Sequence, residues 1–419
     1  LTSITIPDSV TEIGSYVFGE CYGLKEIIVN EGNNNYKSVD GVLFNKDVTK
    51  LIYYPVTRKG EYDMPDSVTT IENDAFLNCR GLTSITIPDG FTEIGYNLFY
   101  GCTGLTSITI PDSVTMIKSG AFKYCSGLTN VTIPNSVTVI EAYAFAGCTG
   151  LESVNIPDSV TEIEYNAFSG CIGLTSIEIP DGISVLDSNT FSGCTGLTSV
   201  TLPDSIVKIY GDAFGECTGL TSITIPDSVT YLSGFSGCTG LTNITIPDSV
   251  TAIGSSAFDG CTGLTSITLP NNIETIGYNP FSGCTGLKEI NISDSNENYK
   301  SIDGVLFNKD VTEIISYPSG REGEYVIPDS VTELGISAFR GCTGLTSVTI
   351  PDSVDKINEY ADDYDFNGCT GLKEINVSDS NEKYKSINGV LFNKDMTKIV
   401  LCPGGKEGEY VIPDNVTEI

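Results

Sequence analysis

The sequence predicts a repeat solenoid, a stack of short strand-containing coils, because one segment of 23 residues recurs along almost the whole chain. Residues 105–127 read LTSITIPDSVTMIKSGAFKYCSG, and neighbouring segments differ from this one at only a few positions. A fixed period of this length is the sequence signature of a solenoid. Two runs of cysteines spaced by 23 residues mark the period most clearly: Cys79, Cys102, Cys125, Cys148, Cys171, Cys194 and Cys217, then Cys238, Cys261 and Cys284.

Each repeat begins with a segment that is typical of a strand. In residues 105–110, LTSITI, apolar and hydroxyl-bearing side chains alternate over a β-branched run. This alternation predicts a strand with one buried face. Pro111 then ends the strand, and Asp112 favours a turn because its side chain bonds nearby backbone amides.

The rest of the repeat supplies a second set of apolar residues: Val114, Ile117, Ala121, Phe122 and Cys125. Their spacing predicts a short strand or turn followed by a helical turn. In a stack each residue lies above its counterpart, so a continuous buried spine is expected from Phe76, Phe99, Phe122, Phe145, Phe168, Phe191 and Phe214. Full burial of each phenylalanine contributes about 1.5 to 3 kcal/mol.

The pattern LxxIxIPxxVxxIxxxAFxxC resembles the BspA-like, or Treponema-type, class of bacterial leucine-rich repeats over almost the whole chain. The resemblance implies a curved, right-handed leucine-rich-repeat solenoid, mostly β with short helical turns, whose parallel β-sheet lies on the concave side. It also implies a cell-surface or secreted protein that acts in adhesion and protein recognition. The asparagine that usually follows the strand in leucine-rich repeats is absent, so no asparagine ladder is expected.

Stacked coils share one continuous core, so we expect a single solenoid domain over residues 1–419. The chain starts in mid-strand at Leu1 and stops inside a coil at Ile419, which predicts a fragment of a longer chain. Its longest apolar runs are far shorter than the roughly 20 residues that cross a bilayer. We therefore expect no membrane insertion in this fragment.

Three inserts interrupt the period, at about residues 24–59, 287–321 and 372–406. Each contains the sequence VLFNKD followed by a second apolar run. In the first insert, residues 41–44 and 48–52 flank a short polar segment at 45–47, which predicts a β-hairpin that enlarges its coil.

Charge is unevenly divided between the inserts and the plain coils. The inserts hold 16 of the 22 basic and 14 of the 54 acidic residues, so they are nearly neutral, whereas the plain coils carry a balance of −34. Such a field disfavours nucleic acid and anionic lipid. It serves the solubility of a long stack, and it also makes the inserts a candidate place for a protein or glycan ligand to approach. The candidate residues there are Tyr36, Lys46, Tyr53, Tyr54, Tyr299, Lys309, Tyr317, Tyr384 and Lys394.

The outward residues of the repeated strand form a second candidate binding surface, on the expected concave sheet. They are small and mostly carry hydroxyl groups: Ser107, Thr109, Asn130, Thr132, Ser153, Asn155, Ser176, Glu178, Ser199 and Thr201. Serine and threonine are also favourable in any solvated strand. Alternatively, this surface binds a glycan or an extended peptide through many weak hydrogen bonds.

The composition argues against catalysis. The chain contains no histidine, which removes Ser-His-Asp and Cys-His nucleophile systems and imidazole metal sites. A glycosidase needs only two carboxylates around a cleft, but here the acidic residues repeat on every coil. We therefore expect no enzyme, no catalytic residue and no cofactor.

The cysteines and acidic residues leave two alternatives open. Stacked cysteines about 5 Å apart are within disulfide range, but their apolar position favours reduced, buried thiols. We expect no metal site among them, and we expect Cys402, outside the ladder, to react first. Aspartates of the PDS turns favour turn formation over calcium binding. Better calcium candidates are Glu359, Asp362, Asp363 and Asp365.

Three classes of function follow from these observations. The first is an adhesion or protein-recognition module with a protein or glycan partner. The second is a passive spacer or stalk that presents another domain, because near-identical coils preserve length rather than a site. The third, an enzyme, is nearly excluded.

Overall fold

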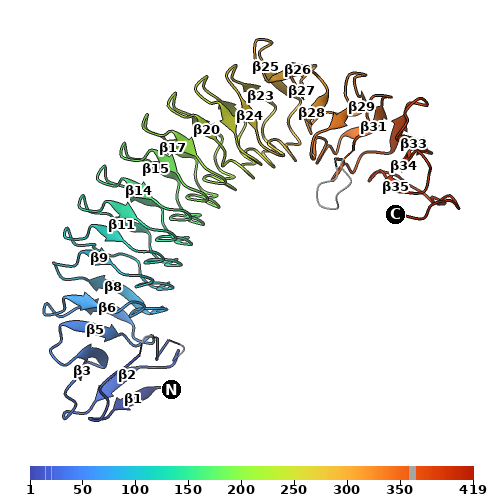
Figure 1. Ribbon diagram of the computed structural model, residues 1–419. Helices are drawn as coiled ribbons and strands as arrows, with labels where there is room; N and C mark the ends of the chain where they lie inside the picture. The colour runs from blue at the N-terminus through green and yellow to red at the C-terminus, as the bar shows by residue number, and fades with distance from the viewer. Residues whose placement is uncertain (15, 20, 358–364) are drawn as a thin grey trace. The chain divides into compact units, whose positions relative to one another are not determined.

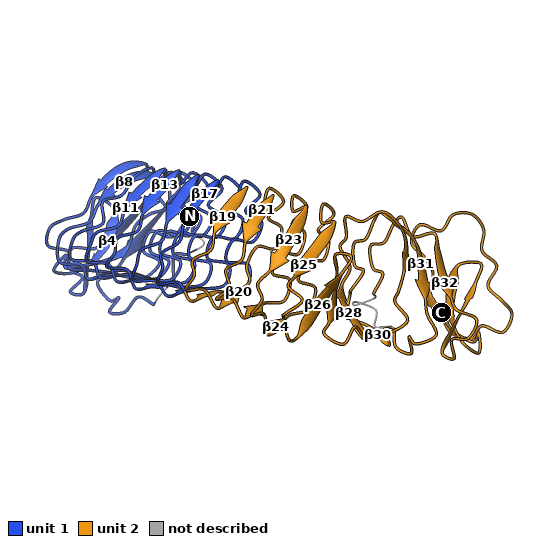
Figure 2. Ribbon diagram, turned by 90° about the horizontal axis from the view of Figure 1, so that it is seen from above, with its two compact units in different colours: residues 1–206, 212–220 blue, residues 207–211, 221–419 orange. Residues whose placement is uncertain are grey.

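The computed structural model describes residues 1–14, 16–19, 21–357 and 365–419. Contacts divide the chain into two compact units, unit 1 with residues 1–206 and 212–220 and unit 2 with residues 207–211 and 221–419 (Figure 2). Within each unit the coils follow one another in sequence order (Figure 1). The fold class is confirmed as a solenoid of parallel stacked strands, and the single domain over 1–419 stays a prediction.

Unit 1 contains two sets of parallel strands and the first insert. The strands of the main sheet, formed by the LTSITI segments and their counterparts, are β1 (Ser3–Ile6), β2 (Glu26–Val29), β6 (Gly60–Asp63), β8 (Leu82–Thr86), β11 (Asn130–Thr132), β13 (Ser153–Asn155), β15 (Ser176–Glu178) and β17 (Ser199–Thr201). The second sheet contains β7 (Thr70–Ile71), β9 (Glu93–Ile94), β10 (Met116–Ile117), β12 (Val139–Ile140), β14 (Glu162–Ile163) and β16 (Val185–Leu186). The insert forms β3 (Tyr36–Val39), β4 (Val42–Asn45) and β5 (Lys50–Tyr53).

Unit 2 repeats this arrangement and contains the other two inserts. Its main sheet contains β19 (Ser222–Thr224), β21 (Asn243–Thr245), β23 (Ser266–Leu269), β25 (Glu289–Ile292), β29 (Gly323–Val326), β31 (Leu345–Ile350) and β32 (Glu374–Val377). The second sheet contains β18 (Lys208–Ile209), β20 (Tyr231–Leu232), β22 (Ala252–Ile253), β24 (Thr275–Ile276) and β30 (Glu333–Leu334). The inserts form β26 (Tyr299–Ile302), β27 (Val305–Asn308), β28 (Glu313–Ser316), β33 (Tyr384–Ile387), β34 (Val390–Asn393) and β35 (Ile399–Leu401).

The strand pairing follows the sequence period. β11 pairs with β13 in parallel, Asn130 beside Ser153 and Thr132 beside Asn155, and both pairs are 23 residues apart. The residue between them, Val131, is buried, as the alternation predicts. Repeats in register therefore place like residues above one another.

The phenylalanine spine is confirmed in each unit. In unit 1 the rings of Phe145 and Phe168 stack with centroids 5.2 Å apart and planes 5° apart, and Phe191 continues the stack 5.5 Å from Phe168. In unit 2 Phe235 and Phe258 stack at 5.6 Å. These rings are fully buried. The array thus hides side chains that one coil alone would expose.

The expected helical turn is wrong: the described residues contain no helix, and the segment before each cysteine is a series of tight turns. The Cys125 amide donates to the Phe122 carbonyl three residues back, at 3.0 Å. The Phe122 and Tyr124 amides instead donate to the next coil, to the carbonyls of Ala144 and Ala146. In a helix these amides would donate to carbonyls of the same segment. Here they bond the neighbouring coil instead, so no helix forms.

The inserts form antiparallel meanders rather than single hairpins. The predicted hairpin is present, since β4 pairs with β5 in the first insert and β27 with β28 in the second. A second hairpin, β3 with β4, precedes it. Its turn at Asp40 and Gly41 has positive φ at both residues, 49° and 77°, as a type I′ turn requires. The Asp-Gly pair is a hairpin signal that the sequence analysis missed.

Candidate functional site

The ten outward strand residues lie together on the main sheet of unit 1, and all are exposed. We call this surface, from Ser107 to Thr201, the main face. The backbone of Thr109 pairs in parallel with that of Thr132 in the next coil, and Glu178 pairs with Thr201 in the same way. The face therefore continues from coil to coil. Glu178 is its one charged member among the ten. The face is therefore nearly neutral within an acidic chain.

None of these ten side chains makes a hydrogen bond within the described part of the chain. Threonines of the neighbouring column behave differently. The hydroxyl of Thr106 donates to the Thr83 carbonyl at 3.2 Å, and that of Thr198 donates to the Thr175 carbonyl at 3.1 Å. The main face thus keeps its donors and acceptors available, whereas the adjacent hydroxyl groups reinforce the stack.

The insert tyrosines are mostly buried, which corrects their assignment as binding residues. Tyr54 is 1% exposed and packs against Phe76 with ring centroids 4.9 Å apart. The Tyr53 hydroxyl donates to the Phe18 carbonyl at 3.1 Å. Burial raises the pKa of Tyr317 to about 12. These side chains have no surface to offer a partner.

Two further insert tyrosines close an open strand edge. The Tyr299 hydroxyl accepts the Ile276 amide at 3.0 Å, and the buried Tyr384 hydroxyl accepts the Ile357 amide at 3.1 Å. In a plain coil the next second-sheet strand would occupy this place. Tyr36, the counterpart in the first insert, is half-buried. The Tyr299 and Tyr384 hydroxyls are therefore used within the fold, which does not support a binding role for them, and a binding role for Tyr36 stays a prediction.

The three insert lysines donate to carbonyls of their own insert. Lys46, Lys309 and Lys394 each bond the carbonyl of an asparagine 13 residues earlier, and Lys309 also bonds the Asp294 carbonyl at 3.0 Å. These three lysines therefore contribute hydrogen bonds within their own inserts, although Lys46 and Lys394 remain exposed.

Those asparagines, Asn33, Asn296 and Asn381, are the residues that sequence reasoning missed, and we call them the docking asparagines. The Asn33 amide group donates to the carbonyls of Pro7 and Val10 in the preceding coil, at 2.8 and 3.0 Å. Its side-chain oxygen accepts the amides of Asn35 and Tyr36. All three are at most 1% exposed. Their signal was the shared sequence N-x-x-Y-K-S in every insert.

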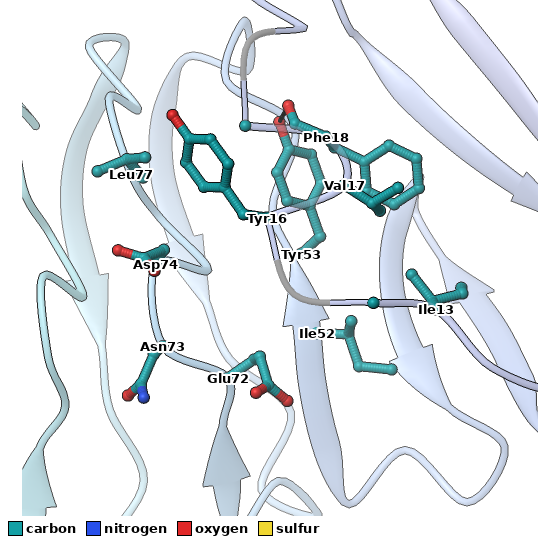
Figure 3. A pocket seen from close by; sticks show the side chains of 12 residues that line it. Ile13, Tyr16, Val17, Phe18, Ile52, Tyr53, Glu72, Asn73, Asp74 and Leu77 are labelled. Atoms are coloured by element: carbon teal, nitrogen blue, oxygen red, sulfur yellow. Dashed lines mark hydrogen bonds between the residues drawn. The ribbon is translucent and has the colours of Figure 1, made fainter.

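The inserts of the two units produce equivalent hollows beside the second sheet. In unit 1 a small cavity of about 90 Å³ is lined by Ile13, Tyr16, Ile52 and Asp74 among others (Figure 3). In the close view the rings of Tyr16 and Tyr53 lie on one side and the Glu72 and Asp74 carboxylates on the other. The hollow in unit 2, about 430 Å³, shares part of this lining, with Ile276 and Ile315 at the places that Ile13 and Ile52 occupy in unit 1. Each hollow arises where an insert interrupts the second sheet.

All 14 cysteines are free, and those of the ladder are buried. The Cys148 thiol donates to the Phe122 carbonyl at 3.1 Å, a bond that recurs along the ladder. Burial raises the pKa of the Cys194 thiol to about 12. The ladder thus holds protonated donors in place of disulfides, and Cys402 is exposed.

Within the described ranges, no group of three or more cysteine or acidic side chains is placed to hold a metal ion. Of the calcium candidates, Glu359, Asp362 and Asp363 lie outside the described residues, and Asp365 is buried. In the same part of the chain, no helix has the length and apolar character of a membrane span.

The stacked coils, the two sets of parallel strands and the buried Leu, Ile and Phe columns define a leucine-rich-repeat solenoid. The family model for BspA type leucine-rich repeat regions matches residues 1–59, 46–172, 115–234, 233–321 and 323–406. The chain belongs to this family.

Solved structures of bacterial leucine-rich-repeat proteins are similar to the chain. A leucine-rich cell surface protein from Faecalibacterium prausnitzii matches with a TM-score of 0.53 and 28% identity, over 82% of this chain and 94% of that one. A leucine-rich repeat protein from Bacteroides ovatus matches with a TM-score of 0.49 and 26% identity, over 81% and 92%. The leucine-rich repeat protein of Treponema pallidum matches with 0.39 and 28%, over 47% and 91%. No curated protein matches the chain.

Proposed function

We propose that the chain is a non-enzymatic recognition or adhesion module, at a cell surface or secreted, that binds a protein or glycan through the main face. The single observation that carries this proposal is the row of ten exposed side chains whose polar groups make no internal hydrogen bond in the described part of the chain. Many weak bonds along such a row suit an extended ligand. The cell surface location of the Faecalibacterium prausnitzii protein supports the localisation.

A passive spacer is the second candidate, and the inserts favour it. Four of their six candidate tyrosines are buried, and their three candidate lysines donate to backbone carbonyls of the same insert, so these side chains offer a partner less than their residue types suggest. A spacer has no ligand of its own. The two candidates therefore differ in whether any ligand binds the main face.

The test is a binding screen of the purified full chain on a glycan array and a peptide array. We expect hits that the variant Thr132→Ala, Asn155→Ala, Glu178→Ala weakens at least about tenfold, because binding energy concentrates in a few contacts. A matched control changes exposed residues in or next to second-sheet strands, Thr138→Ala, Glu162→Ala and Val185→Ala, and should bind as the unchanged chain does. The absence of hits, or hits insensitive to the main-face variant, would favour the spacer.

A further inference from the structure

The hollow in unit 2 lies where the second insert interrupts the second sheet. It is lined by residues of β24, β28 and β30, by the turns that follow β24 and β30, and by one side chain of the next coil. We call it the insert hollow, and its lining includes Ile276, Tyr278, Asn279, Glu313, Glu333 and Lys356. Its volume of about 430 Å³ is sufficient for a small organic molecule.

One strand of the insert hollow carries a charge reversal relative to the other two inserts. The third insert has Lys398 at this position, with its ammonium 3.0 Å from the Glu418 carboxylate, and the first insert has Lys50, which also forms an ion pair. The second insert has Glu313 instead, directly beside Glu333 in the parallel register of β28 and β30. Two carboxylates therefore stand side by side where the other inserts place a lysine.

One of these two carboxylates lacks a cation in the described part of the chain. The Lys356 ammonium lies 2.8 Å from the Glu333 carboxylate, whereas no cation lies within ion-pair distance of Glu313. Burial and the neighbouring Glu333 carboxylate raise the pKa of Glu313, and Lys356 offsets this only in part. The charged side chains of the hollow therefore leave one negative charge without a counterion.

Two uncharged acceptors of the insert hollow also lack donors among the described residues. In a plain coil the carbonyl at this place of the second sheet accepts an amide of the next coil, as when the Gly277 amide donates to the Ile253 carbonyl at 2.9 Å. β24 is the last strand of its sheet, so the Ile276 carbonyl receives no such bond. The buried Oδ1 of Asn279 has no partner either. The hollow thus offers acceptors in excess of donors.

Much of the remaining lining is apolar. It includes Ile315, Leu334 and Ile336, and it also includes Tyr278, whose side chain is 66% exposed. An aromatic ring attracts a cation over its face. A bare metal ion would find few ligands on such a lining, and no group of three or more acidic or cysteine side chains in the described ranges is placed to hold one. The lining therefore favours a cation with an apolar body.

We propose that the insert hollow binds a primary ammonium group carried on a short apolar chain. An ammonium supplies three N–H donors and one positive charge. These match the acceptors without donors, namely the Glu313 carboxylate, the Ile276 carbonyl and the Asn279 Oδ1. The apolar chain lies against Ile315 and Leu334. A free alkylamine and a lysine side chain of a partner protein share this chemistry.

The experiment titrates the full chain with n-pentylamine near neutral pH and follows binding by saturation-transfer difference NMR. Salt at about 0.15 M screens charges beyond about 8 Å, which suppresses non-specific attraction to the acidic chain. Pentylamine should bind saturably. Its uncharged analogue 1-pentanol should bind at least about tenfold more weakly, because it leaves the Glu313 charge unpaired.

A second ligand distinguishes the two sources of the ammonium group. N-acetyl-lysine methylamide carries the same ammonium and alkyl chain attached to a peptide backbone. Binding comparable to that of pentylamine would assign the hollow to a lysine side chain of a partner, and binding of pentylamine alone would assign it to a free amine.

The variant Glu313→Lys gives the second insert the residue of the other two. It should weaken pentylamine binding at least about tenfold, while its melting temperature stays equal or rises because a carboxylate pair becomes an ion pair. Glu313→Gln keeps the shape, removes only the charge and should also weaken binding. The control Glu324→Lys changes the net charge as Glu313→Lys does, at an exposed position of β29, and should bind pentylamine normally.

Three results would overturn the proposal: no saturable binding of pentylamine at about 10 mM, tenfold above a dissociation constant of about 1 mM; equal binding of 1-pentanol; or unchanged affinity of both Glu313 variants. Displacement of pentylamine by an equal concentration of K⁺ or Ca²⁺ would assign a bare cation and also overturn it. The main-face variant of the previous section should bind pentylamine normally. Failure here is thereby distinct from failure of the proposed function.

Discussion

The plain coils and the inserts use polar side chains in opposite ways. In the plain coils of unit 1, the stack is held by buried columns such as Phe145 and Phe168, and the main face is left free of internal hydrogen bonds. In the inserts, Asn296 and Lys309 are bound to backbone carbonyls and Tyr317 is buried. The nearly neutral charge of the inserts predicted that a ligand would approach the chain there. The difference teaches that equal numbers of basic and acidic residues in a segment do not by themselves indicate a surface open to a partner, because some of those side chains can be bonded within the fold.

The physical reason lies in the backbone groups at each interruption. A plain coil satisfies its amides and carbonyls with its neighbours, as when the Glu141 amide donates to the Ile117 carbonyl at 2.9 Å. An insert departs from the period, so the preceding coil loses that partner. Side chains replace it: Tyr299 accepts the Ile276 amide, and Asn296 donates to the Ile273 carbonyl. Buried backbone groups must be paired, which commits these polar residues to the fold.

The largest expected effect tests the cysteine ladder of the plain coils by pH. Burial raises the pKa of Cys194 and of Cys284 to about 12 from 9.0. The unfolded thiols ionise above about pH 9 and the folded ones do not, so their stabilising contribution is complete below pH 9 and is lost as pH rises from 9 to about 12. At pH 11 the free energy of unfolding should be lower than at pH 8 by about 2 to 3 kcal/mol for each such thiol.

The measurement is the urea midpoint at pH 8 and pH 11. Cys194→Ala should lower the urea midpoint at pH 8. Between pH 8 and pH 11 the midpoint of this variant should then fall less than the midpoint of the unchanged chain. A pH dependence equal to that of the unchanged chain would contradict the buried-thiol interpretation.

The next effect concerns the spine. Phe168→Ala removes a fully buried ring between Phe145 and Phe191, and it should destabilise unit 1 by about 3 to 5 kcal/mol. Urea unfolding followed by circular dichroism measures this. Phe168→Leu keeps most of the volume and should cost clearly less. Equal losses for both variants would mean that ring stacking, rather than volume, decides stability.

A smaller effect belongs to the insert. Asn33→Ala removes the four hydrogen bonds of a fully buried side chain and leaves the Pro7 and Val10 carbonyls without it, so about 2 to 3 kcal/mol should be lost. Hydrogen exchange should accelerate over residues 30–46. The exposed neighbour Asn35 is the control, since Asn35→Ala should change stability by less than about 0.5 kcal/mol. Similar exchange in both variants would show that the insert holds without its docking asparagine.

The sequence predicted the parts of the fold that repetition determines, namely the period, the repeated strand, the Phe168 spine and the hairpin at residues 41–52. It did not predict the parts that depend on groups brought together from different coils. The absence of a helix before Cys125 follows from amides that bond the next coil, and the role of Asn33 follows from carbonyls about 25 residues away. The main face was identified as a surface.

The smallest expected effect separates two threonines of one plain coil, Thr201 at the end of β17 and Thr198 immediately before that strand. The Thr198 hydroxyl donates to the Thr175 carbonyl at 3.1 Å, whereas the Thr201 hydroxyl has no partner within the described residues. Thr198→Val should therefore cost about 0.5 to 1 kcal/mol, and Thr201→Val should leave stability within about 0.5 kcal/mol. In a ligand-binding assay the order should reverse, with Thr201→Val weakening any main-face ligand and Thr198→Val having no effect. If both substitutions changed stability by the same amount and neither changed ligand binding, the main face would be only a solvated strand surface. Its hydroxyl groups would then not differ measurably from those that bond the neighbouring coil.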